Sequence, residues 1–214
     1  MHALVAVLIR PRETMRRILD AGRDRAVPLL VLGAIVAAFA HDLDIENVRQ
    51  LDTSASYVGL FIAAALIAVA LAFYLAFHAF AWLVTLVGRF FEGKGDFAAV
   101  RSALAWGLAP MVWSLLYRAP LAIWFASSEA IQTARVKAAE GTLRMDPGLL
   151  AHGCGLALVF GLLDLIVTVW TVVVGSSTLA EANGISTMRG FLVLAISLLT
   201  PVIVIVAAVL AALT

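Results

Sequence analysis

Charged residues are scarce in this chain: they make up 14% of its 214 residues, whereas hydrophobic residues make up 63%. A soluble domain normally carries roughly 25% charged residues, which cover its surface. The sequence therefore excludes a soluble globular enzyme, and its apolar content excludes a disordered chain. The single cysteine, Cys154, excludes an intrachain disulfide and a thiolate metal cluster. A mean hydropathy of +1.03 favours a polytopic helical membrane protein instead.

Catalytic motifs are also missing. The sequence contains neither HExxH nor GxSxG, and no pair of aspartates lies within an apolar run. These absences predict a protein that is not an enzyme and that has no catalytic residues, bound metal or cofactor. The formal net charge of +1 gives no reason to expect a nucleic-acid partner.

The long apolar runs predict an all-α fold with five transmembrane helices, since a crossing takes about 20 apolar residues. We divide the chain into a cytoplasmic interfacial segment, residues 1–25, and a membrane domain, residues 26–214. The predicted spans cover residues 26–45, 57–88, 102–128, 148–178 and 191–213. The third contains Pro110 and Pro120, so a re-entrant pair of short helices is the alternative there.

The N-terminal segment has the pattern of an amphipathic helix lying on the membrane. Its apolar face would enter the headgroup boundary, and its basic face would bind anionic lipid. Alternatively, these arginines only set the orientation of the chain. The basic face consists of Arg10, Arg12, Arg16 and Arg17.

The distribution of basic residues predicts the orientation. With the N-terminus inside, the inner segments hold ten of the 15 Lys and Arg residues and the outer segments hold five. This bias favours an N-terminus inside and a C-terminus outside.

The connection Gly88–Phe97, GRFFEGKGDF, matches the beginning of a phosphate-binding loop. However, Gly95 stands where a Ser or Thr would hold magnesium, and an apolar helix precedes the loop in place of a buried strand. We therefore predict a flexible turn in which Asp96 caps the following helix.

Ionisable residues inside the apolar runs are candidates for a functional site, because a charge in the bilayer is costly. His78 and Asp164 have compatible depths in the predicted spans, and we expect them to meet as a proton- or cation-sensitive site or as a link between helices. Arg118 either extends toward the outer interface or contacts a substrate, and His152 lies near the outer end of the fourth span.

Small residues suggest where helices pack closely. Four alanines recur at four-residue spacing in the second span, and Gly153, Gly155 and Gly161 thin the fourth. We expect these positions to form seams within the chain or the contact of a homo-oligomer. The alanines are Ala64, Ala68, Ala72 and Ala76.

Four short stretches occur in the order seen in a known family of five-span membrane proteins. They are PRETMRRI (Pro11–Ile18), EGKGDF (Glu92–Phe97), LAPMVW (Leu108–Trp113) and LAEANGISTMRGF (Leu179–Phe191). On these stretches the chain resembles the Yip1-domain family. The resemblance implies five spans, a cytoplasmic N-terminus and a role through protein partners.

Eukaryotic members of that family work in vesicle traffic with small GTPases and carry a longer cytosolic region before the first span. This chain has only about 25 residues there, so it is more similar to the bacterial branch. Some bacterial relatives act as companions of transport systems. The resemblance thus implies a protein of the bacterial cytoplasmic membrane.

The residues and the resemblance leave two functions open. The first is an accessory protein of a transporter or of envelope homeostasis, which contacts its partner or lipid through Lys94, Arg189 and the N-terminal arginines. The second is a small permease or lipid-moving protein. That second function requires His78, Asp164 and Arg118 to face one wet cavity.

Overall fold

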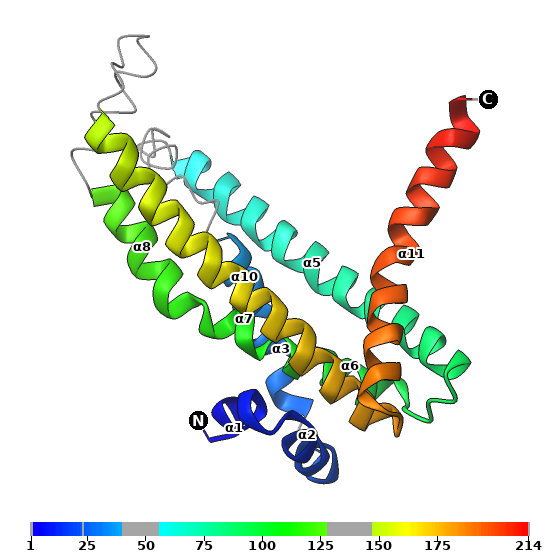
Figure 1. Ribbon diagram of the computed structural model, residues 1–214. Coiled ribbons are helices and arrows are strands. Elements are labelled where there is room, and N and C mark those ends of the chain that lie inside the picture. Colours follow the sequence, from blue (N-terminus) through cyan, green and yellow to red (C-terminus); the bar gives the residue numbers. More distant parts are fainter. Residues whose placement is uncertain (1, 23, 40–55, 128–146, 214) are drawn as a thin grey trace.

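Every regular element in the part of the chain that the structure describes is a helix. The computed structural model describes residues 2–22, 24–39, 56–127 and 147–213 (Figure 1). A helix satisfies its backbone hydrogen bonds internally, which the lipid interior demands. The protein is therefore an all-α polytopic membrane protein, as predicted. Within the described residues, four helical segments are long and apolar enough to cross a membrane: Ala64–Phe90, Phe97–Pro120, Leu158–Asn183 and Thr187–Ala211.

Three long helices correspond to the second, fourth and fifth predicted spans. They are α5 (Ser56–Phe90), α10 (Pro147–Asn183) and α11 (Thr187–Leu213). Most of their apolar side chains are exposed, as expected for helices whose solvent is lipid. The helix α10 continues five residues beyond the apolar run that predicted it, a difference that matters for the depth of Asp164.

The first predicted span corresponds to a shorter apolar helix, α3 (Val27–Phe39). Its 13 residues extend about 20 Å at 1.5 Å per residue, less than the thickness of a hydrocarbon core. The rest of the predicted span, residues 40–45, lies outside the described residues.

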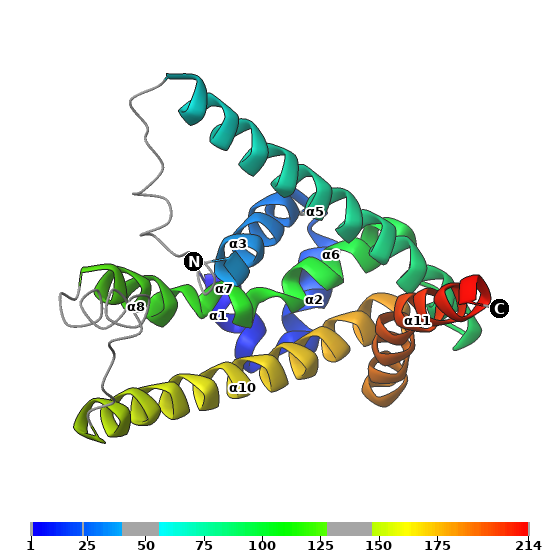
Figure 2. The ribbon, with the colours of Figure 1, turned by 90° about the horizontal axis from the view of Figure 1, so that it is seen from above.

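The third predicted span is broken into α6 (Phe97–Gly107), α7 (Ala109–Trp113) and α8 (Leu115–Ser127). The first break precedes Pro110, as expected for a residue that cannot donate a backbone hydrogen bond. Pro120, by contrast, lies inside α8. The three pieces continue across the molecule in one general direction, so they do not form the re-entrant pair (Figure 2).

The helix α6 forms the centre of the bundle and contacts α3, α5 and α10. One apolar cluster around Trp106 joins α6 to the N-terminal helices and to α3. A second cluster around Val100 and Leu104 joins α6 to α5, α10 and α11. Asp96 caps α6 as predicted, because its carboxylate accepts a hydrogen bond of 2.7 Å from the backbone nitrogen of Ala99.

Close helix crossings occur at glycines that the sequence pattern did not single out. A Cβ on Gly107 would lie 2.8 Å from the Cα of Gly175, where α6 crosses α10. A Cβ on Gly190 would lie 2.5 Å from the carbonyl oxygen of Ser176, where α11 leaves α10. Of the glycines predicted as seams, Gly155 and Gly161 have no such neighbour within 4 Å among the described residues, and the surroundings of Gly153 lie outside the description. The alanine stripe on α5 is likewise exposed within this chain.

The N-terminal segment forms two helices, α1 (His2–Ile9) and α2 (Pro11–Asp20), where a single helix was predicted. The residue before a proline is disfavoured in helical conformation, and Arg10 has φ −131° and ψ 67°. The apolar face of α2 is also a correction. Met15 and Ile18 are buried in the protein core with Val27 of α3, so this face does not enter lipid.

Segments that are distant in sequence meet at one end of the bundle (Figures 1 and 2). This end, which we call the turn end, comprises α2, the α5–α6 turn (residues 91–96) and the α10–α11 turn (residues 184–186). The orientation predicted from basic residues puts all three segments on the same side of the membrane. The C-terminal end of α11 lies at the opposite end of the molecule (Figure 1).

Candidate functional site

Arginines of α2 hold the end of α10 at the turn end. The Nε of Arg12 donates to Oε2 of Glu181 at 3.1 Å, and the Nε of Arg16 donates to Oε1 at 2.6 Å. Arg12 also reaches the carbonyl oxygen of Ile185 at 3.3 Å. Since the Glu181 side chain is only 10% exposed, its two oxygens are fixed between the arginines. The hydrogen bond and charge of Glu181 raise the pKa of Arg16 above its ordinary value.

The other two arginines of the basic face are directed elsewhere. Arg10 and Arg17 both pair with Glu13 of the same helix, at 3.6 Å and 2.5 Å, and their side chains are largely exposed. The basic face of α2 is therefore divided into two halves: Arg12 and Arg16 bind Glu181 of α10, whereas Arg10 and Arg17 pair with Glu13 of their own segment. Arg10 and Arg17 are the half that faces outward from the protein.

The glycines of the α5–α6 turn enclose Asn183, the last residue of α10. The backbone nitrogen of Lys94 donates to the Asn183 carbonyl at 3.0 Å, and the Asn183 Nδ2 donates to the Leu179 carbonyl at 3.0 Å. A Cβ on Gly93 would lie 2.7 Å from the Asn183 Oδ1, and one on Gly95 would lie 2.7 Å from the Ala182 carbonyl oxygen. The glycine spacing that resembles a phosphate-binding loop thus serves to admit Asn183.

The α10–α11 turn reverses the chain through Gly184, whose φ of +66° suits a residue without a side chain. The backbone nitrogen of Ile185 donates to the Ala180 carbonyl at 2.9 Å, and that of Gly184 donates to the Glu181 carbonyl at 3.2 Å. These bonds satisfy carbonyls at the end of α10 and fix the direction of α11.

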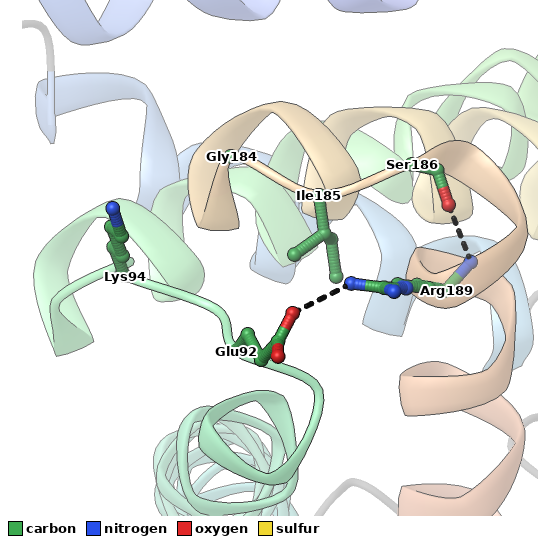
Figure 3. Close-up of a pocket in the computed structure, with 6 residues that line it drawn as sticks. All are labelled: Glu92, Lys94, Gly184, Ile185, Ser186 and Arg189. Carbon is green, nitrogen blue, oxygen red and sulfur yellow. Dashed lines mark hydrogen bonds and ion pairs between the residues drawn. The ribbon is translucent and has the colours of Figure 1, made fainter.

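A hollow of about 590 Å³ lies between the two turns (Figure 3). The Nη1 of Arg189 lies 3.0 Å from Oε2 of Glu92 across it, and Lys94 lies at its other side. The structure thus brings together Lys94 and Arg189, which the sequence pointed to separately. The lining consists of Glu92, Lys94, Gly184, Ile185, Ser186 and Arg189.

A second polar cluster lies within the membrane segments. The Nη2 of Arg118 lies 2.7 Å from Oδ1 of Asp164, and the Tyr117 hydroxyl donates to the same oxygen at 2.5 Å. The Nη1 of Arg118 donates to the Ala37 carbonyl at 2.8 Å, at the end of α3. Arg118 therefore links α3, α8 and α10, and neither extension to the interface nor substrate binding is needed to explain its place.

The expected meeting of His78 and Asp164 is wrong. The side chain of Asn183 lies against Gly88, so these two residues mark the same level on α10 and α5. His78 precedes Gly88 by 10 residues, whereas Asp164 precedes Asn183 by 19. At 1.5 Å per residue the two side chains differ in depth by about 13 Å.

His78 instead contacts its own helix and α6. Its Nδ1 lies 2.8 Å from the Tyr74 carbonyl oxygen, and its ring lies against those of Tyr74, Phe77 and Phe97. The side chain of His152 is not among those that the structure describes. In the described parts of the chain, no three His, Cys, Asp or Glu residues are grouped to hold a metal.

Sequence reasoning missed the acidic and amide residues that organise the turn end. Glu181 and Asn183 lie within the stretch that suggested the family resemblance, but neither was given a role. The signal was present in their position, because both polar residues follow closely on the apolar run that predicted the fourth span. Tyr117, the neighbour of Arg118, was missed because a tyrosine near the membrane boundary is common.

Comparison with known families adds one result. The Yip1 domain matches residues 5–209 of the chain, which is nearly its whole length. No curated protein and no solved structure matches it.

Proposed function

Because the chain belongs to the Yip1-domain family, whose members are not enzymes, we propose that it acts by binding another membrane protein at its turn end. The role would be that of an accessory subunit of a transporter or of an envelope-homeostasis factor. Proteins of this family act through protein partners in membrane trafficking.

The observation that carries the proposal is the division of the arginines on α2. Arg12 and Arg16 fix the helix to Glu181, and the apolar face of α2 is buried, so the helix has a defined position. Arg10 and Arg17 share Glu13 as their ion-pair partner, and the three side chains together present one net positive charge on the exposed side of a fixed helix. A fixed exposed charge favours recognition of an acidic partner surface, because little conformational entropy is lost on binding.

A permease or lipid-moving protein is the competing function. Transport requires the polar side chains at membrane depth to lie together along one path through the protein. The pairing of Arg118 with Asp164 and the different depth of His78 support separate structural roles for these residues. They support the partner-binding proposal in preference to transport.

Co-purification tests the proposal. We expect the full-length protein, extracted in mild detergent after cross-linking in its native membrane, to retain a stoichiometric membrane companion. Replacing Arg10 and Arg17 by glutamate reduces that companion, because the charges at the contact are reversed. The matched control is Arg144→Glu, in a connection that the sequence places on the other side of the membrane. Equal recovery from all three proteins contradicts the proposal, and a second copy of this chain as sole companion replaces it with homo-oligomer formation.

The proposal includes five crossings of a bacterial cytoplasmic membrane with the N-terminus inside. The shorter helix α3 would belong to the first of these crossings, in addition to the four longer segments. Reporters fused to the two ends of the chain are expected to report opposite compartments. Reporters in one compartment would contradict an odd number of crossings.

A further inference from the structure

The hollow between the two turns has the side chains of an anion site. Lys94 and Arg189 contribute two positive charges to its lining, against one negative charge from Glu92. The Ser186 hydroxyl oxygen accepts from the backbone nitrogen of Arg189 at 3.4 Å, and its proton remains available to donate. Figure 3 shows Arg189 and Glu92 pointing toward each other, with Lys94 on the opposite side.

The existing ion pair leaves room for an external anion. Arg189 and Glu92 are both mostly exposed, and an exposed ion pair contributes little to stability. No described residue forms an ion pair with Lys94. A ligand with concentrated negative charge therefore competes with one weakly held carboxylate for two cations.

Exposed apolar side chains close in sequence to two of the lining residues indicate the kind of ligand. Phe90, two residues before Glu92, is 87% exposed, and Met188, next to Arg189, is 67% exposed. In a chain whose helices cross a membrane, large exposed apolar side chains such as these are compatible with contact with lipid. Cations adjoining such apolar groups at the ends of membrane helices are typical of the level of the phospholipid headgroups.

We propose that this hollow binds the phosphate of an anionic phospholipid through Lys94, Arg189 and Ser186. The acyl chains of the lipid lie beside Phe90 and Met188. The site is distinct from Arg10 and Arg17 of α2, which carry the proposed function. Failure of one proposal therefore leaves the other intact.

Native mass spectrometry of the full-length protein in detergent tests the site, with phosphatidylglycerol, phosphatidylcholine and glycerol phosphate as separate probes. Phosphatidylglycerol is expected to bind more tightly than phosphatidylcholine, whose headgroup carries a compensating positive charge. Glycerol phosphate, which has no acyl chains, is expected not to displace it. Displacement at equal concentration would assign the hollow to a free phosphate and overturn the lipid proposal.

Three substitutions localise the binding. Lys94→Gln and Arg189→Gln are each expected to weaken phosphatidylglycerol binding about 5-fold, the effect of one surface cation on an anionic lipid. Glu92→Gln is expected to strengthen it, because the competing carboxylate is removed. The opposite sign of this third result excludes misfolding as the cause of the first two.

The control removes the same number of charges outside the hollow. Arg10→Gln/Arg17→Gln, on α2, is expected to bind phosphatidylglycerol like the unaltered protein. A loss in this double variant equal to that of Lys94→Gln/Arg189→Gln would mean that the lipid responds only to overall charge. That result, or unchanged binding in all variants, overturns the proposal.

Discussion

Replacing Asp164 with leucine is expected to lower the free energy of unfolding by about 3 kcal/mol. The reason is that Arg118, whose side chain is 14% exposed, keeps its charge at membrane depth after the carboxylate is removed. Its remaining described bond is to the Ala37 carbonyl. Unfolding in mixed micelles of mild detergent and SDS, followed by circular dichroism, measures the change.

A double variant separates the unpaired charge from the loss of packing. Asp164→Leu/Arg118→Leu removes both charges, so it is expected to unfold less readily than Asp164→Leu alone. Thr168→Val is the control on the same helix, because within the described structure the Thr168 hydroxyl bonds to the carbonyl of Asp164 one turn away. If the single and double variants were equally destabilised, the ion pair would not be the cause.

Replacing Gly93 with alanine is expected to lower the free energy of unfolding by about 1–3 kcal/mol, the usual cost of overpacking. The added Cβ would lie 2.7 Å from the Asn183 Oδ1 and 2.8 Å from the Gly88 carbonyl oxygen. The second of these atoms belongs to the backbone, so a rotation of Asn183 alone does not relieve the contact. The same unfolding titration in mixed micelles measures the loss.

Gly161→Ala is the matched control for this substitution. A Cβ on Gly161 has no neighbour within 4 Å in the described structure, and the residue lies in the middle of α10. Alanine is expected to be neutral or slightly stabilising there, since it favours helix. Equal losses for Gly93→Ala and Gly161→Ala would show that the α5–α6 turn is not closely packed around Asn183.

The helical class and most helix positions were predictable from local chemistry. Apolar runs of membrane length gave α5, α10 and α11 within a few residues, and Asp96 was recognised as the cap of α6 from its place before an apolar pattern. Each of these predictions depends on neighbours along the chain. The break before Pro110 also follows from a local property, because proline cannot donate a backbone hydrogen bond.

The depth of Asp164 was not predictable in the same way, because the end of a membrane helix is not marked by the end of its apolar run. The sequence placed the end of the fourth span at residue 178, whereas α10 continues to Asn183. With the helix end five residues later than predicted, Asp164 lies at a different depth from His78. It lies instead at the level of Arg118, whose basic side chain had been assigned to the outer interface.

The close helix crossings were hidden for a different reason. In lipid, a helix gains nothing from turning its apolar face inward, so the pattern of apolar residues does not reveal which face packs. The stripe of alanines on α5 is therefore exposed, although its spacing resembled a seam. Gly107, Gly175 and Gly190 could be identified only when three helices were placed together.

The bond between Arg12 and Glu181 has a consequence for the synthesis of the protein. The two residues are 169 positions apart, so at 5–20 residues per second a ribosome takes about 10–30 s to make the second after the first. During that interval α1 and α2 have been synthesised, but Glu181, to which Arg12 binds, has not. Docking of α2 therefore belongs to the last stage of assembly, after α10 has entered the bilayer.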